Sequence, residues 1–200
     1  MPRLSPRLSD EGLDLIFRNA RSYTGYTEEP VTEADMDAIW ELMKFGPTSA
    51  NLLPARIVWC KSQEAKDKLA SVATEENVGP IQKAPVTAII AMDMEFYEQA
   101  PKLFLLADVR SWFTGPEAQV YEAAFRNSTL QGAYFIIAAR ALGFDCGPMS
   151  GFDPAKVDEL FLAGTTYRSN FLCTVGHGDP ASLHYGRQPR PPFDWFNTIV

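Results

Sequence analysis

The chain has 200 residues, a length that fits one domain, and 46% of them are hydrophobic, which is enough for a sizeable core. Its formal net charge of −7 argues against binding to nucleic acid or to an anionic membrane, because both need a basic face. The N-terminal stretch from Met1 to Arg7 is followed by no apolar core, so it is not a signal peptide, and no apolar stretch is long enough to span a membrane. We expect a single domain over residues 1–200, located in the cytoplasm.

Two helices are predicted in the first quarter of the chain. The first runs from Asp10 to Arg21, with Ser9 as its N-cap and apolar residues at spacings of three and four. The second begins at Thr32, which has capping-box spacing to Asp35, and stops at Gly46-Pro47. One face of this second helix is expected to be buried, namely Met36, Ile39, Trp40 and Met43.

The middle of the chain predicts two strands, residues 56–61 and 86–92, and a short helix over residues 63–72 capped by Ser62. The strand at 86–92 is continuously apolar, so both of its faces are expected to be covered. Residues 93–115 are rich in aromatic side chains and irregular. A loop of that length is typically functional or contains short helices.

Residues 117–142 form the longest predicted helix, and its second half is crowded with Gly and Ala. So long and apolar a helix favours a homodimer interface over burial within one small domain. The sequence then predicts a strand-like step at Cys146 and a helix over 154–161 started by Asp153-Pro154. A strand over 170–175 and an extended arm from Gly176 come next. Because the elements show no regular βαβ rhythm, we predict an α+β fold and not a doubly wound sheet.

Two loops contain Gly, Pro and small hydroxyl residues together, residues 45–51 and residues 147–152. Such loops expose backbone N–H groups, which suits a flat cofactor with polar edges. The chain has only two His and no evident pair of nucleophile and base, so we expect no catalytic side chain and look for chemistry carried by a bound cofactor. No metal site is predicted, and Cys60, Cys146 and Cys173 are interpreted as buried, reduced thiols.

One apparent motif is rejected. Residues 176–181 match G-x-G-x-x-A after a strand, but Pro180 and its successors open no helix and too few residues remain for a following parallel strand. Asp93, Glu95 and Glu98 suggest a site for a hard metal ion, although acidic residues after a strand are usually solvated.

Polar and basic residues gather near the two Gly/Pro loops and the tail. Arginine beside turns suits a phosphate, and asparagine offers both a donor and an acceptor to a pyrimidine-like ring edge. Each residue has a structural explanation when taken singly, and their joint occurrence favours a site. The set is Arg21, Thr48, Ser49, Asn51, Asn77, Ser150, Gly151, Arg187 and Arg190.

At these residues the chain resembles the FMN-dependent nitroreductase family, from about Ile16 to Phe193, and within it the branch of malonic semialdehyde reductases and NADH dehydrogenase/NAD(P)H nitroreductases. Pro-Thr-Ser-x-Asn combined with Gly-Pro-Met-Ser-Gly-Phe is the specific part of the likeness. The matching stretches are residues 20–22, 44–51, 84–90, 125–128, 147–153 and 176–179.

The resemblance implies a central mixed sheet flanked by helices, an extended C-terminal arm, and a homodimer built on the long helix with an FMN in each of two sites between subunits. It implies contacts to the ribityl chain and phosphate from Arg21, Tyr23, Gly25 and Arg187. It implies contacts to the flavin ring from Pro47, Thr48, Ser49 and Asn51 of the other subunit, and from Asn77, Met149, Ser150 and Gly151. A cover over the substrate is implied for residues 108–113, with Arg110, Trp112 and Phe113 as the substrate-binding residues.

One departure from the family pattern concerns phosphate binding, because many members carry a second basic residue four positions after the first Arg and this chain has Gly25 there. The resemblance implies a ping-pong reaction in which NADH or NADPH reduces the flavin and a small acceptor then reoxidises it. The acceptor is a semialdehyde such as malonic semialdehyde, giving 3-hydroxypropanoate, or alternatively a nitroaromatic or a quinone. Two other interpretations stay open: a flavin-binding carrier or sensor without efficient turnover, and an interaction domain without a cofactor.

Overall fold

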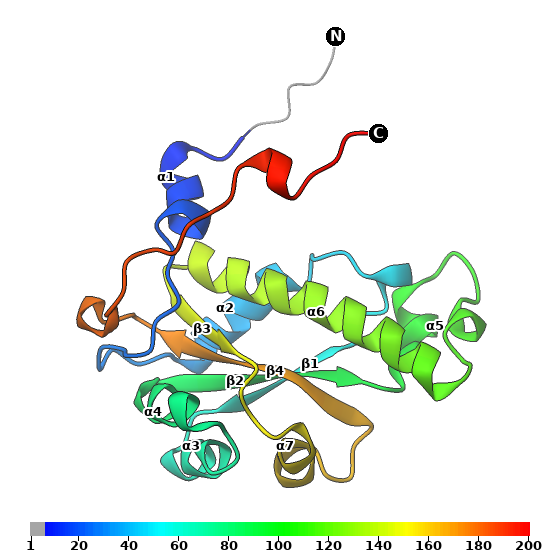
Figure 1. Cartoon of the computed structure of the whole chain (residues 1–200). Helices are drawn as coiled ribbons and strands as arrows, with labels where there is room; N and C mark the ends of the chain where they lie inside the picture. The colour runs from blue at the N-terminus through cyan, green and yellow to red at the C-terminus, as the bar shows by residue number, and fades with distance from the viewer. Residues whose placement is uncertain (1–6) are drawn as a thin grey trace.

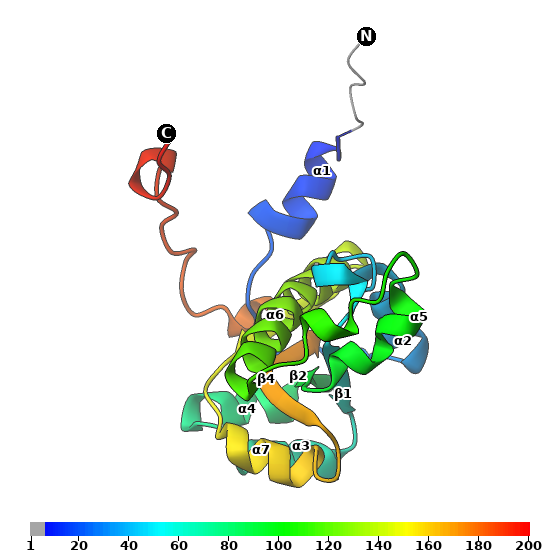
Figure 2. The ribbon, with the colours of Figure 1, turned by 90° about the vertical axis from the view of Figure 1, so that its right-hand side faces the viewer.

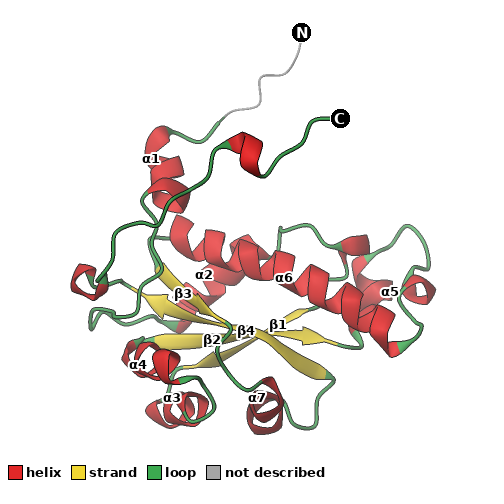
Figure 3. Cartoon of the chain, viewed as in Figure 1, coloured by secondary structure: helices red, strands yellow, loops and turns green. Residues whose placement is uncertain are grey.

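The computed structural model describes residues 7–200 and contains a four-stranded sheet between two layers of helices (Figure 1). The strands lie in the order β1-β2-β4-β3. Helices α2 and α6 cover one face of the sheet, and α3, α4 and α7 cover the other (Figure 3). The strands are β1 (Ala55–Cys60), β2 (Val86–Asp93), β3 (Asp145–Met149) and β4 (Tyr167–Gly176). The helices are α1 (Asp10–Leu13), α2 (Glu33–Met43), α3 (Gln63–Ala70), α4 (Glu75–Lys83), α5 (Ala100–Leu103), α6 (Glu117–Ala141) and α7 (Pro154–Phe161).

The predicted α+β fold is confirmed, with one correction to the sheet. All three ladders between the four strands are antiparallel, and parallel pairing is limited to an isolated bridge between Ser22 and Cys146. That bridge joins the N-terminal segment to β3. Strand β2 is buried along its whole length, as its unbroken apolar sequence predicted, because it lies inside the sheet with helices on both faces.

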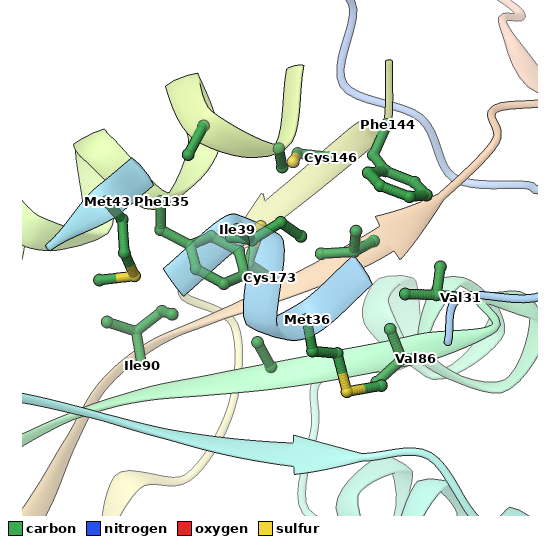
Figure 4. Packing of buried hydrophobic residues seen from close by; sticks show 14 residues of the cluster. Val31, Met36, Ile39, Met43, Val86, Ile90, Phe135, Phe144, Cys146 and Cys173 are labelled. Atoms are coloured by element: carbon green, nitrogen blue, oxygen red, sulfur yellow. The ribbon is translucent and has the colours of Figure 1, made fainter. Parts of the chain in front are cut away.

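The core has a separate apolar cluster on each face of the sheet. Met36, Ile39 and Met43 of α2 pack with Phe135 of α6 over strands β2 and β4 on one face (Figure 4). Leu69, Ile81 and Val157, from α3, α4 and α7, form the centre of the other cluster. Trp40 was expected to be buried on this face of α2, but 37% of its surface stays exposed, because it lies beside a cavity over the edge strand β1.

Local capping explains where several helices begin. Ser9, Ser62 and Asp153 each accept a hydrogen bond from a backbone N–H three residues later, as predicted. Thr32 and Asp35 form both hydrogen bonds of the predicted capping box. The first helix is shorter than expected, because after α1 the chain makes one π-helical turn over Asp14–Arg18 and then leaves the helix. Arg21 therefore lies in an extended segment.

Helix α4 was not predicted, because Gly79 and Pro80 interrupt its sequence and both residues disfavour a helix interior. Residues 93–115 contain short helical turns and α5, in agreement with one of the two expectations for that segment. The C-terminal arm is extended, and in Figure 2 it and α1 leave the body on the same side. Within residues 7–200, no helix combines the length and apolarity needed to cross a bilayer.

Candidate functional site

A cavity of about 550 Å³ is lined by residues of the N-terminal segment, the last turn of α6 and the C-terminal arm. Figure 1 shows these three segments meeting at one end of α6. The distinguishing feature of the cavity is a set of four guanidinium groups from three separate parts of the chain. These belong to Arg21, Arg140, Arg187 and Arg190, and the rest of the wall is formed by Phe17, Ala20, Ser22, Tyr185, Gly186 and Gln188.

Two of these arginines hold the arm against the N-terminal segment. Arg21 donates from Nη2 to the carbonyl oxygen of Tyr185 over 2.7 Å, and Arg187 donates from Nη2 to the carbonyl oxygen of Ala20 over 2.7 Å. Each guanidinium has five N–H donors, so both retain donors for another group in the cavity. None of the four arginines forms an ion pair with a carboxylate of residues 7–200. The cavity is therefore a local concentration of positive charge in an acidic chain.

The next residues of the N-terminal segment pack tightly on the start of the arm. The Tyr23 ring covers Gly178, where an added Cβ would approach a ring atom to 2.4 Å. Burial, followed by the Asp145 carboxylate, raises the pKa of the Tyr23 hydroxyl. A Cβ at Gly25 would lie 2.8 Å from the Cβ of Ser182, so position 25 leaves no space for a side chain unless the arm moves.

The loop after β3 forms part of a second cavity of about 470 Å³, which Met149 and Ser150 line together with residues of α6 and β4. The backbone N–H groups of Ser150 and Gly151 donate no hydrogen bond to the described part of the chain. Asn77 of α4 donates from Nδ2 to the Gly151 carbonyl oxygen over 2.8 Å and to Thr74 Oγ1 over 3.2 Å, which leaves its Oδ1 as an acceptor. The structure thus brings Asn77, Ser150 and Gly151 together.

Strand β3 connects the two cavities. Its residue Cys146 bridges to Ser22 beside the arginine cavity, and its last residue, Met149, lines the second cavity. Three residues of strand span about 10 Å at 3.3 Å per residue. A ligand with an anionic end and a flat end at that separation is able to engage both cavities.

The loop containing Pro47, Thr48, Ser49 and Asn51 lines neither of these cavities within one chain. It is held in place by α6, because the Ser49 N–H donates to Asn127 Oδ1 over 2.7 Å. Asn51 donates from Nδ2 to the Leu103 carbonyl oxygen over 2.9 Å. Its backbone is unusual, since Ala50, Asn51 and Leu53 all have positive φ. Pro47, Ser49 and Asn51 stay exposed.

The expected substrate cover lies apart from both cavities within one chain. Arg110 is ion-paired with Glu98, and this hydrogen-bonded pair lowers the pKa of the Glu98 carboxyl. Phe113 packs edge-on against Phe96, whereas Trp112 is 66% exposed. Both aromatic residues line a smaller cavity of about 170 Å³ near the start of α6.

Other parts of the chain have structural explanations. The three cysteines are buried, as expected, and burial raises the pKa of the Cys60 thiol to about 12. Asp93, one of the acidic residues considered for a metal, is instead ion-paired with Arg56 at 2.7 Å. Across residues 7–200, no group of three His, Cys, Asp or Glu side chains is placed to hold a metal ion.

The sequence reasoning missed Arg140, which ends the longest helix and lines the arginine cavity. Its Nε atom is buried and has no hydrogen-bond partner among residues 7–200. A single charge in the last turn of an apolar helix is commonly explained by the helix dipole, so the sequence pattern did not distinguish it. Arg140 becomes notable only once the N-terminal segment and the arm are placed beside it.

Comparisons with known proteins identify the family of the chain. The sequence model of the Nitroreductase family matches residues 17–177. The chain is 54% identical over 187 residues to a "Putative NADH dehydrogenase/NAD(P)H nitroreductase" of Burkholderia lata, covering 94% of this chain and 95% of that protein. A protein of the same name from Stenotrophomonas maltophilia is 51% identical over 191 residues, covering 96% and 97%.

Solved structures show the same fold at lower sequence identity. A nitroreductase family protein from Streptococcus pneumoniae superposes with a TM-score of 0.83 at 22% identity, covering 94% of this chain and 99% of that one. A nitroreductase of Exiguobacterium sibiricum, solved in complex with FMN, superposes with a TM-score of 0.81 at 20% identity, covering 98% and 100%.

Proposed function

This chain belongs to the nitroreductase family, and on that premise we propose that it is a single-domain, FMN-dependent NAD(P)H oxidoreductase. The proposal rests on the cavity lined by four guanidinium groups, which have no carboxylate partner among residues 7–200. Strand β3 leads from this cavity to a loop whose backbone N–H groups donate no hydrogen bond to the described chain. A phosphate ester joined to a flat ring system with polar edges fits both features.

The side chains and backbone groups at and beside the two cavities match the groups of FMN. The arginine cavity supplies several cationic groups, the guanidinium of Arg140 among them, and none of the four has a carboxylate partner among residues 7–200. The 149–151 loop supplies N–H donors, and Asn77 supplies an acceptor. In the proposed complex Arg21 and Arg187 hold the phosphate. Tyr23 and Gly25 line neither cavity themselves and act by packing on the arm, Tyr23 on Gly178 and Gly25 on Ser182. Met149, Ser150, Gly151 and Asn77 orient the ring. When bound, the flavin supplies two-electron chemistry from NADH or NADPH to an acceptor.

We also propose that the site is completed by a second copy of the chain. The loop with Pro47, Thr48, Ser49 and Asn51 lines neither cavity of its own chain, and Pro47, Ser49 and Asn51 are exposed on it. Next to this loop, Phe45 is 78% exposed, and α6 exposes several large apolar side chains, namely Tyr121, Phe125, Leu130 and Tyr134. A homodimer through α6 buries these residues and brings the 47–51 loop to the partner's flavin.

The acceptor in this proposal is a small carbonyl compound such as malonic semialdehyde, reduced to 3-hydroxypropanoate. A nitroaromatic or quinone acceptor is the alternative that the names of the relatives favour. Arg110, Trp112 and Phe113 are proposed to cover the acceptor, because Trp112 is an exposed aromatic ring on the same short segment as Arg110, which is ion-paired with Glu98, and Phe113.

The test is the absorption spectrum of the purified protein, followed by anaerobic addition of NADH or NADPH. We expect flavin bands near ~370 and ~450 nm that are bleached by at least one nucleotide and restored by an acceptor over many turnovers. Malonic semialdehyde, a nitroaromatic and a quinone, compared at equal concentration, distinguish the acceptors. Protein that stays colourless after incubation with FMN contradicts the proposal, and bound flavin that is reduced only slowly indicates a carrier or sensor.

A further inference from the structure

We propose that Arg140, in the last turn of α6, is a phosphate-binding residue of this site, contributing a cation to the arginine cavity. The inference rests on the proposed function and assigns a role to a residue that the sequence pattern did not indicate. The ligand chemistry is a phosphate monoester, as in FMN.

The hydrogen bonding of Arg140 is incomplete within the chain. Its Nη1 donates to the Ile16 carbonyl oxygen at 3.2 Å, whereas its Nε is buried without a partner among residues 7–200. Leaving a buried donor unpaired is unfavourable, and more so when the group is charged. The same side chain lines the arginine cavity, so an anion there is able to pair with the remaining donors of the guanidinium group.

The charge pattern of the arginines supports the same assignment. The arginines outside the cavity are mostly ion-paired with a carboxylate, namely Arg18, Arg56, Arg110, Arg126 and Arg168. The four that line the cavity have no such partner in residues 7–200. The chain has a net charge of −7, so it contains more than enough carboxylates to form an ion pair with each of these four arginines. Their shared lack of pairing therefore indicates a common anionic ligand from outside the chain.

Packing of the N-terminal segment on the arm leaves no room for a second cation at position 25. The Gly25 carbonyl oxygen accepts a hydrogen bond from the Asp179 N–H at 3.0 Å, and Ser182 closes the space where a side chain at position 25 would begin. The N-terminal segment therefore contributes Arg21 to the cavity and is unable to add a cation from position 25. Arg140 reaches the cavity from the helix, and Arg187 and Arg190 reach it from the arm.

The experiment measures binding of FMN and of riboflavin, which lacks the phosphate, to the apo-protein by fluorescence titration. We expect Arg140→Gln to weaken FMN binding about tenfold to a hundredfold while changing riboflavin binding less than about twofold. Arg168→Gln is the matched control, because it makes the same chemical change at an arginine that already has a partner, Glu117. It should leave both affinities unchanged. The salt dependence of FMN binding should also be shallower in Arg140→Gln than in the wild type.

The outcomes separate this inference from the proposed function. Equal losses of FMN and riboflavin affinity in Arg140→Gln would show a purely structural role, through the bond to Ile16, and would overturn the inference. Unchanged FMN affinity would overturn it as well, with the proposed function intact. Wild-type protein that binds neither flavin overturns both. If Arg140→Gln fails to fold, Arg140→Lys replaces it, since Lys keeps the charge but loses the guanidinium fork. A selective loss of FMN affinity of at least about threefold is then expected, and an unchanged ratio of the two affinities overturns the inference.

Discussion

Arg187 donates a hydrogen bond from Nη2 to the Ala20 carbonyl oxygen over 2.7 Å, between residues 167 positions apart in the sequence. Arg21 makes the reciprocal contact to the carbonyl oxygen of Tyr185 over the same distance. The two guanidinium groups thus brace the arm against the N-terminal segment and also face the cavity. Because phosphate binding and arm placement share these side chains, we expect the two to be coupled.

Replacing either arginine tests that coupling. We expect Arg21→Ala and Arg187→Ala each to weaken FMN binding by about tenfold to a hundredfold, since each removes charge-assisted hydrogen bonds. Bound FMN should in turn protect the arm of the wild type from limited proteolysis, and less so in either variant. The measurement is flavin affinity by titration together with the cleavage rate after Gly176. Wild-type affinity in both variants would contradict the assignment of the phosphate site.

Gly25 provides a test of the packing between the N-terminal segment and the arm. Gly25→Ala should lower the free energy of unfolding by about 1–3 kcal/mol, because the new Cβ overlaps Ser182. Adding Ser182→Gly should recover part of the loss, since it removes the opposing Cβ. Gly12→Ala is the control, because an added Cβ there makes only ordinary van der Waals contacts, the nearest at 3.6 Å, and the position is inside α1. Urea denaturation measures all four proteins, and equal effects at positions 25 and 12 would refute the packing argument.

The capping box at the start of α2 predicts an acid-dependent loss of stability. Hydrogen bonds from the Thr32 N–H at 2.8 Å and from its Oγ1 at 2.7 Å lower the pKa of the Asp35 carboxyl below its ordinary 3.8. A lowered folded-state pKa means that the contribution is present above about pH 4 and is lost as the pH falls through the folded value. Asp35→Ala should therefore be destabilising at neutral pH and less so at about pH 3. Asp37→Ala is an exposed change on the same helix, and its effect on stability should not decrease in this way between neutral pH and about pH 3.

The raised pKa values of two buried thiols predict that the protein loses stability at alkaline pH. Burial raises the pKa of Cys60 from 9.0 to about 12, and a hydrogen bond with Cys146 together with burial raises that of Cys173. The unfolded chain releases these protons first, so the free energy of unfolding should fall as the pH rises above about 9. Cys60→Ala should reduce that slope. In native protein at about pH 8, Ellman's reagent should leave the cysteines unmodified, whereas rapid labelling would contradict their burial.

Features set by local chemistry were predictable from the sequence, and features set by tertiary contacts were not. Ser9, Thr32 and Ser62 identified helix starts because a cap and its partner lie within three residues. Helix α4 was missed because burial of Ile81 outweighs the unfavourable Gly79-Pro80 pair. The order of the strands depends on packing between distant segments, so no local pattern contains it.

The same distinction applies to the candidate site. Met149, Ser150 and Gly151 lie in one loop, and their grouping was evident from its composition. Arg140 was overlooked because its surroundings come from the N-terminal segment and from the arm about 45 residues later. The 47–51 loop is separate from the cavities of its own chain, so a single chain is insufficient to test its assignment.

The way in which the loop after α2 is anchored determines which of its positions tolerate substitution during evolution. Its path is fixed from outside, because Asn127 accepts from the Ser49 N–H and Gln131 accepts from the Ala55 N–H, and both belong to α6. Backbone anchoring of this kind constrains the loop's shape without constraining its exposed side chains. Natural variation and laboratory libraries therefore have freedom at Ser49, which is exposed and anchored through its backbone N–H, to alter chemical preference, provided that the two amide side chains on the helix are kept.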